Sequence, residues 1–181
     1  MVGAKLKAAA FACAALLIGT SQASLVLQPN GVEVLDTDTN LLWLYNWSSS
    51  GFTSWSGAKT WAAGLTVGGA VAGEWRLPEI GEYDDLWADS DVGSSLSGLQ
   101  SKFTGVKDYI YWSGTAYAPQ PGDAWVFITT NGTKGGNQPF SALYAEAVRS
   151  AGSASSVPEP ESLALMGVAL AGLAATQRRK Q

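Results

Sequence analysis

The side chains in this sequence that could do chemistry are carboxylates, tyrosines and tryptophans. The chain has no histidine, and its one cysteine, Cys13, lies in an N-terminal apolar run that we expect to be removed. Nucleophiles that depend on Cys or His, and the usual zinc sites, are therefore excluded from the mature protein. What remains is acid–base chemistry by carboxylates or tyrosines, and contact through aromatic faces.

Two pairs of carboxylates are candidates for metal binding or catalysis. Asp36 and Asp38 lie in a polar stretch between two β-prone runs, where they either ligate calcium or bond to their own backbone in a turn. Glu79 and Glu82 are three residues apart, which suits a general acid–base pair but also the first turn of a helix. We favour the structural alternative for both pairs. The prediction is therefore no cofactor, with calcium at Asp36 and Asp38 as the alternative.

The predicted mature chain is acidic. Residues 24–157 carry six Lys and Arg side chains against thirteen Asp and Glu side chains, a net charge of −7. An acidic surface without a basic cluster argues against nucleic acid and anionic lipid as partners. Part of this negative charge comes from a cluster of four aspartates: Asp84, Asp85, Asp89 and Asp91. Their spacing is not that of an EF-hand calcium loop, so we expect a solvated acidic face.

Aromatic and amide side chains in expected loops are candidates for ligand binding. A sugar site needs flat aromatic faces beside amides and carboxylates on a rigid scaffold. Trp47, Tyr117 and Asn137, with the loops around them, could supply these groups. The alternative for each aromatic ring is packing in the core or against its own loop.

The stretch Trp75-Arg76-Leu77-Pro78 is predicted to organise the domain as a strand-to-helix junction. Proline lacks an N–H and suits the first turn of a helix, and it pushes Leu77 toward an extended conformation. A second helix is therefore expected from Pro78 to about residue 88, with a packing reason for Gly81 inside it. Arg76 is predicted to be a structural cation, held by carboxylates or carbonyls while its stem packs on an indole.

The rest of the chain predicts one further helix and several short strands. Apolar residues at helical spacing indicate the first helix over 55–65, capped by Thr53 or Ser54 and ended by Gly68-Gly69. Residues 32–44 predict a hairpin, 93–107 an irregular excursion, and Asn131-Gly132 a hairpin turn, followed by a looser turn at 135–137. Strands are also predicted at 25–27, 108–113, 124–129, 140–144 and 146–149, with 124–129 central and buried on both faces. The fold class is α+β, with two helices packed on small antiparallel sheets.

Both ends of the chain have the composition of sorting signals. Residues 1–23 combine lysines, a short apolar core and a small-x-small site ending at Ala23, which predicts a signal peptide cut by signal peptidase. The predicted domain is 24–150 and the linker 151–157. The remaining segment, 158–181, contains Pro158-Glu159-Pro160, a thirteen-residue apolar run and the basic tail Arg178-Arg179-Lys180. A helix of that run spans ~20 Å, short of the ~30 Å hydrocarbon core, so we expect a temporary membrane stop with a cytoplasmic basic end.

This C-terminal segment resembles a PEP-CTERM sorting signal. Pro158-Glu159-Pro160, the short apolar run and the Arg178-Arg179-Lys180 tail stand in the order typical of that signal. The resemblance implies a Gram-negative protein that is held briefly in the inner membrane and then processed by an exosortase-type enzyme. Such proteins are released or attached at the surface, typically with exopolysaccharide.

Residues 32–150 resemble the Lcl C-terminal domain family, whose fold is C-type-lectin-like. The matching blocks are Val34-Leu35-Asp36, Asn40-Leu41-Leu42-Trp43, Trp55, Ala58, Leu65, Trp75-Arg76-Leu77-Pro78, Tyr111-Trp112-Ser113-Gly114-Thr115, Ala124-Trp125-Val126 and Ala147-Val148-Arg149. The resemblance implies adhesion, including to sulfated polysaccharides, through a trimeric form. The collagen-like region that helps to assemble such trimers is missing here, and the net charge of −7 fits poorly with an anionic ligand.

Two further points limit what the resemblance implies. Glu79 stands where the family usually has Thr, which puts the cap of the second helix in doubt. The Arg-Leu-Pro junction is also similar to that of formylglycine-generating enzymes, but their active-site cysteines are missing from the mature chain. That activity is therefore not carried over.

These observations predict an exported surface or matrix protein that is not an enzyme and that binds glycan or another polymer. One alternative is a structural matrix protein without a specific ligand, held by self-association. The other is a glycan hydrolase that uses a carboxylate pair such as Glu79 and Glu82.

Overall fold

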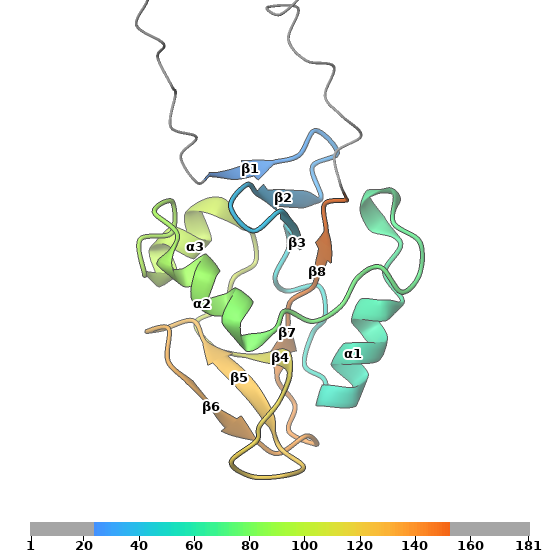
Figure 1. The fold of residues 1–181 in the computed structure, drawn as a ribbon, viewed down its shortest axis with the longest axis vertical. Helices are drawn as coiled ribbons and strands as arrows, with labels where there is room; N and C mark the ends of the chain where they lie inside the picture. Colours follow the sequence, from blue (N-terminus) through green and yellow to red (C-terminus); the bar gives the residue numbers. More distant parts are fainter. Residues whose placement is uncertain (1–23, 153–181) are drawn as a thin grey trace, which may run out of the picture.

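The structure, a computed structural model, describes residues 24–152 (Figure 1). Its elements form two four-stranded sheets with three α-helices and one short 3₁₀ helix, so the α+β class is confirmed with one helix more than predicted. The elements are β1 (Leu25–Leu27), β2 (Glu33–Asp36), β3 (Leu41–Leu44), α1 (Trp55–Ala63), η1 (Val67–Gly69), α2 (Ile80–Ala88), α3 (Leu96–Lys102), β4 (Ile110–Ala116), β5 (Ala124–Ile128), β6 (Lys134–Asn137), β7 (Tyr144–Ala145) and β8 (Val148–Ser150).

The first sheet has the strand order β1-β2-β3-β8 and is antiparallel throughout. Strands β2 and β3 form the predicted hairpin, in which Asp36 pairs with Leu41. Strand β8 comes from the far end of the domain and pairs with β3. The first and last strands of the described chain therefore lie in one sheet, at the end of the molecule opposite β6 (Figure 1).

The second sheet has the order β6-β5-β4-β7, and β7 runs parallel to β4, so the expectation of antiparallel sheets was wrong at this edge. Strand β5 is central, as its apolar run predicted. Phe127 packs on Tyr83 of α2, whereas Val126 lies in the core cluster that also holds Ala58 and Ala62 of α1. Successive residues of a strand point to opposite faces, so the two faces of β5 contribute to two different cores.

Three local predictions need correction. Helix α2 begins at Ile80 rather than Pro78, because Glu79 is still extended. A Cβ on Gly81 would meet nothing within 4 Å, so the packing reason expected for this glycine does not exist. The stretch 93–107 contains helix α3, whose start is capped when the Ser95 hydroxyl accepts the Gly98 N–H at 3.0 Å.

Two glycine signals were also assigned to the wrong structure. Helix α1 ends at Gly64, before the predicted Gly68-Gly69 terminus. The glycines at 135 and 136 lie in strand β6, not in a loose turn, because β6 pairs with β5 along its whole length. The hairpin turn at Asn131-Gly132 joins these two strands, and Gly132 has the left-handed φ of 71° that such a turn needs.

The Trp75–Pro78 junction connects the two sheets. Arg76 exchanges backbone hydrogen bonds with Val148 of β8 at 2.9 and 2.8 Å, and the Pro78 carbonyl accepts the Gly114 N–H of β4 at 2.7 Å. Trp75 and Leu77 are buried in the second core. The prediction of an extended approach to Pro78 is confirmed, and the junction holds both sheets at once.

Several predicted features lie outside the described residues. These are the signal peptide 1–23 with Ala23, most of the linker, and the segment 158–181 with its apolar run. Of the helices within 24–152, none has the length and hydrophobicity that a membrane span requires.

Candidate binding site

The carboxylates after Pro78 are occupied by structural contacts. Glu82 accepts two hydrogen bonds from the Arg76 guanidinium, at 2.7 and 2.6 Å, and this pairing is the main reason that the pKa of Arg76 is raised. Glu82 also accepts the Glu79 N–H at 2.7 Å, and Glu79 accepts the Thr115 hydroxyl. The doubtful cap of α2 is thus supplied by Glu82. Arg76 is held by a carboxylate and by the Leu77 carbonyl, as predicted, but the cation over the Trp75 indole is Arg149.

Trp47 cannot form a binding face, which corrects its place among the candidate ligand-binding residues. Its side chain is 0% exposed. Its ring packs against Phe103 and Tyr111 with centroids 5.3 and 5.2 Å away, and its backbone N–H donates to the Thr104 carbonyl at 2.9 Å. The loop that carries Trp47 is covered by the segment after α3, so this indole belongs to the core.

Tyr117 and Asn137 lie close together but on opposite faces. The Tyr117 ring packs edge-on against Trp125, with centroids 4.6 Å apart, and covers Gly136, where a Cβ would overlap it. Asn137 is the next residue of β6 and therefore points to the other face. Its Oδ1 accepts the Ser141 hydroxyl at 2.7 Å. The structure thus leaves Tyr117 half-buried beside Trp125 and gives Asn137 a role in a turn.

A different set of aromatic rings forms an exposed cluster, which we call the aromatic platform: Phe52, Tyr109 and Tyr144. Phe52 is 56% exposed and Tyr109 41% exposed. The three rings contact one another, with centroid distances of 5.3 Å (Phe52–Tyr109), 4.4 Å (Phe52–Tyr144) and 5.8 Å (Tyr109–Tyr144). They come from the loop before α1, the residue before β4 and strand β7, so no local pattern in the sequence brings them together.

Backbone pairing and core packing hold the aromatic platform in place. Thr53 and Leu143 exchange backbone hydrogen bonds at 2.9 and 3.0 Å, which sets Phe52 beside Tyr144. Tyr144 stacks on buried Tyr111 at 5.6 Å, and Tyr111 packs in turn on Trp47. The platform is the outer end of an aromatic array that begins in the core, so its rings are held rigid before any ligand arrives.

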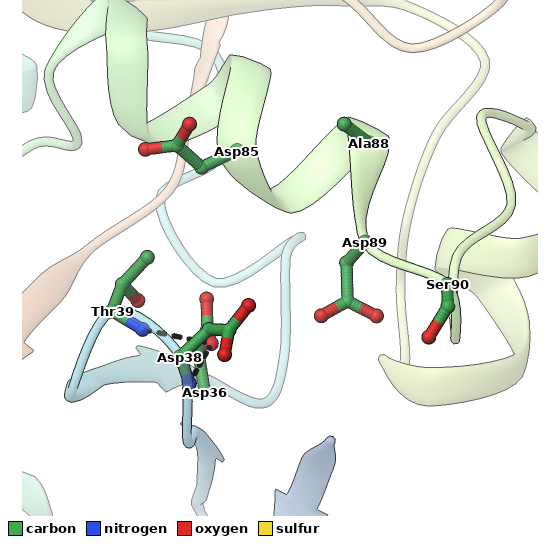
Figure 2. Close-up of a pocket in the computed structure, with 7 residues that line it drawn as sticks. All are labelled: Asp36, Asp38, Thr39, Asp85, Ala88, Asp89 and Ser90. Carbon is green, nitrogen blue, oxygen red and sulfur yellow. Dashed lines mark hydrogen bonds between the residues drawn. The ribbon is translucent and has the colours of Figure 1, made fainter. Parts of the chain in front are cut away.

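An acidic pocket lies between the β2–β3 turn and the C-terminal end of α2 (Figure 2). Its volume is about 420 Å³, and it is lined by Asp36, Asp38, Thr39, Asp85, Ala88, Asp89 and Ser90. The Asp36 carboxylate accepts the N–H groups of Asp38 and Thr39 at 2.9 and 3.2 Å (Figure 2). Asp36 is therefore a turn-forming residue, as the structural alternative predicted.

The electrostatics of this pocket disfavour further negative charge. Burial is the main reason that the pKa of Asp89 is raised; the charges of Asp36, Asp91 and Asp38 add to the shift, and the Asp91 N–H opposes it. Within residues 24–152, no group of three or more acidic side chains is arranged to hold a metal ion. Binding of calcium by Asp36 and Asp38 stays a prediction.

The fold and surface define a small two-sheet α+β domain with an exposed aromatic platform and an acidic pocket. Residues 32–149 match the Lcl C-terminal domain family, and the chain belongs to that family. Residues 156–180 match the PEP-CTERM protein-sorting motif. The motif implies recognition by an exosortase-type sorting enzyme and export through the inner membrane to the cell surface. A comparison with curated proteins finds no significant match.

Proposed function

We propose that the exported protein is a non-enzymatic adhesion module of a Gram-negative bacterium that binds neutral polysaccharide at the cell surface or in the extracellular matrix. The observation that carries this proposal is the aromatic platform, because its rings are exposed, in mutual contact and rigidly supported. The proposal includes a C-type-lectin-like fold for the two-sheet domain.

The aromatic platform has the chemistry that a sugar ring requires. One face of a pyranose presents C–H groups and packs on an aromatic ring, while its hydroxyl edge needs hydrogen-bonding groups. Phe52 offers an apolar face, and the tyrosines add phenolic hydroxyls beside theirs. A surface that is fixed before binding loses little conformational entropy when the ligand docks. These properties support polymer binding at Phe52, Tyr109 and Tyr144 rather than at Trp47.

The charge of the domain supports a neutral polymer as the ligand. Residues 24–157 carry a net charge of −7, which repels sulfated or carboxylated chains at low ionic strength. The local charges near the platform, Lys107 and Asp108, are of opposite sign. An anionic ligand would therefore find no basic groove on this surface.

The contacts of the candidate catalytic pair support a non-enzymatic role. A hydrolase would need one carboxyl to protonate the leaving group and another to act as base or nucleophile. Glu82 is engaged by Arg76 and the Glu79 N–H, and Glu79 by Thr115. Both residues hold the start of α2 in place.

The exposed rings also favour a second candidate, a structural matrix protein that self-associates through the platform. An apolar cluster with Phe52 56% exposed would bury surface against a second copy as readily as against a sugar. The two candidates differ in stoichiometry. Self-association predicts a molecular mass that rises with protein concentration and no saturable binding of polysaccharide.

The test is binding of the exported, processed protein to neutral, acidic and sulfated polysaccharides, with calcium and with chelator. We expect saturable binding to the neutral class, weakened about tenfold or more by Phe52→Ala or Tyr109→Ala. Tyr117→Ala, which removes a half-buried ring outside the aromatic platform, should leave the affinity unchanged. A loss of binding in Tyr117→Ala alone would move the site to the Tyr117–Trp125 face, and loss with chelator would assign calcium to the acidic pocket. No binding to any class by folded protein would contradict the proposal.

A further inference from the structure

One buried carboxyl group has no role in the site described above. Glu146 lies in the short link between β7 of the second sheet and β8 of the first. Its side chain is 0% exposed, and neither carboxyl oxygen has a hydrogen-bond partner within the described structure. A buried polar group without a partner is rare in folded proteins, and an ionised one is strongly disfavoured.

The surroundings of Glu146 favour its neutral form. Burial raises its pKa well above the ordinary value of 4.5, while the nearby backbone N–H groups of Ala147 and Leu44 oppose the shift. The Leu44 N–H is already used, because it donates to the Ala147 carbonyl at 2.9 Å. No basic side chain contributes to the shift.

The titratable groups that face Glu146 come from two other elements. These are Tyr83 of α2 and Tyr111 of β4, and a charge on Glu146 adds to the rise in the pKa of each phenol. Both phenols are neutral across the physiological range, so neither offers a compensating positive charge. An ionised Glu146 would therefore stand alone among aromatic rings.

The link that carries Glu146 holds the two sheets together. Ala147 accepts the Leu44 N–H of β3, and Val148 pairs both with Trp43 of β3 and with Arg76 at the junction. Trp43 and Trp47 pack beside this link in the core and each leave an indole N–H without a partner. A charge on Glu146 would draw water into this region, since water could hydrogen-bond to the carboxylate and to both indole N–H groups.

We propose that Glu146 is a protonation-dependent lock between the two sheets. With the carboxyl neutral, the β7–β8 link stays closed over the tryptophan core. With the carboxyl ionised, the link opens, and the strand that leads to the C-terminal sorting segment loosens. The aromatic platform is coupled to the lock, because Tyr144 precedes Glu146 by two residues.

The sign of the pH effect follows from proton linkage. A carboxyl whose pKa is raised on folding binds its proton more tightly in the folded state, so it stabilises the fold fully below its unfolded pKa. This stabilisation is lost as pH rises from about 4.5 toward the folded pKa of Glu146. Each pKa unit between the two states changes the ratio of folded to unfolded protein about tenfold.

The experiment compares denaturant unfolding of the exported, processed wild type and Glu146→Gln from pH 4 to pH 9, followed by tryptophan fluorescence. Gln keeps the shape of the neutral acid, so the two proteins should be similar at pH 4. The variant should become more stable than wild type as pH rises, by at least tenfold in the folded-to-unfolded ratio at pH 7. Equal pH dependence of the two proteins would overturn the proposal.

A control variant and a direct measurement complete the test. Glu33→Gln removes the other fully buried glutamate, which has an ion-pair partner, and should lower stability at pH 7 instead of raising it. In wild type, the ¹³C signal of the Glu146 carboxyl should titrate well above pH 4.5. Titration of that signal near 4.5 would overturn the proposal even if Glu146→Gln failed to fold.

Discussion

Two glutamates are buried in this domain, and only one of them has partners. Glu33 of β2 is 2% exposed and receives the Arg149 guanidinium through Nε at 2.7 Å and Nη2 at 2.6 Å, with the Asn30 amide on its other oxygen. Glu146 is equally buried, and among residues 24–152 its carboxyl oxygens have no hydrogen-bond partner. The first acid is held by a cation and an amide, whereas burial without a partner disfavours a charge on the second. Glu33 holds β8 through Arg149, and Glu146 precedes β8 by two residues, so both acids act on this one strand.

The contacts of Arg149 explain why the buried Glu33–Arg149 pair stabilises the fold. Arg149 also donates to the Gly68 carbonyl at 3.2 Å and lies over the Trp75 ring, 5.4 Å from its centroid. The cation therefore ties β8 to β2, to η1 and to the junction at once. A charged pair with these extra contacts compensates for the solvation that both groups lose.

Breaking the Glu33 pair should have the largest effect. Arg149→Met leaves the Glu33 carboxylate buried without a cation, and we expect a loss of about 3 to 5 kcal/mol in the free energy of unfolding at pH 7. Denaturant unfolding measures this loss. Arg76→Met is the matched control, because the Arg76–Glu82 pair is at the surface, with 44% of the Arg76 side chain exposed, and should cost about 1 kcal/mol or less. Equal losses in the two variants would contradict the difference drawn between them.

Substitutions at two neighbouring glycines distinguish backbone strain from disruption of the Glu33–Arg149 pair. Gly68 and Gly69 both have left-handed φ angles, of 68° and 78°, but a Cβ on Gly68 would overlap the Glu33 carboxylate while one on Gly69 meets nothing. We expect Gly69→Ala to cost about 1 kcal/mol and Gly68→Ala about 2 to 4 kcal/mol. Thermal unfolding of both variants measures the difference. If the two melt alike, Glu33 moves aside freely and its pairing is looser than the structure shows.

The smallest effect is expected at the amide partner of Glu33. Asn30→Ala removes one hydrogen bond to a carboxylate that keeps its cation and one from the Val32 N–H within its own turn, so the loss should be about 1.5 kcal/mol. Asn131→Ala is a control of the same type, because Asn131 accepts only from Thr133 within its own turn, and it should cost about 0.5 kcal/mol. A loss in Asn30→Ala no greater than in the control would show that Arg149 alone satisfies Glu33.

The sequence predicted those parts of the fold that depend on neighbours along the chain. The hairpin across 36–40, the central strand β5 and the extended approach to Pro78 each have a local signal, in turn residues, an apolar run and proline chemistry. Helix α3 has no comparable local signal, because Ser and Gly in its sequence favour irregular structure, and its start depends on the Ser95 cap.

The candidate site was harder to predict because it depends on which distant segment covers which loop. The loop sequence around Trp47 favours an exposed side chain. Trp47 is buried because the distant segment at Thr104 pairs with its backbone and covers the loop. Phe52, Tyr109 and Tyr144 meet through the pairing of Thr53 with Leu143, ninety residues apart. Glu146 stands in an alternating stretch that would place it at the surface of a strand, and the crossing from one sheet to the other places it inside.

The position of Tyr144 has a mechanical consequence. Only three residues separate it from β8, the last strand before the sorting motif at 156–180. Tension between a polymer held at the aromatic platform and a C-terminal attachment would run through this short link and largely bypass the three α-helices. Strand β8 would then be loaded in shear along its pairing with β3, with the Arg149–Glu33 pair acting as a cross-brace. The domain would transmit a pull through the β7–β8 link and the first sheet while the α-helices stay largely unloaded.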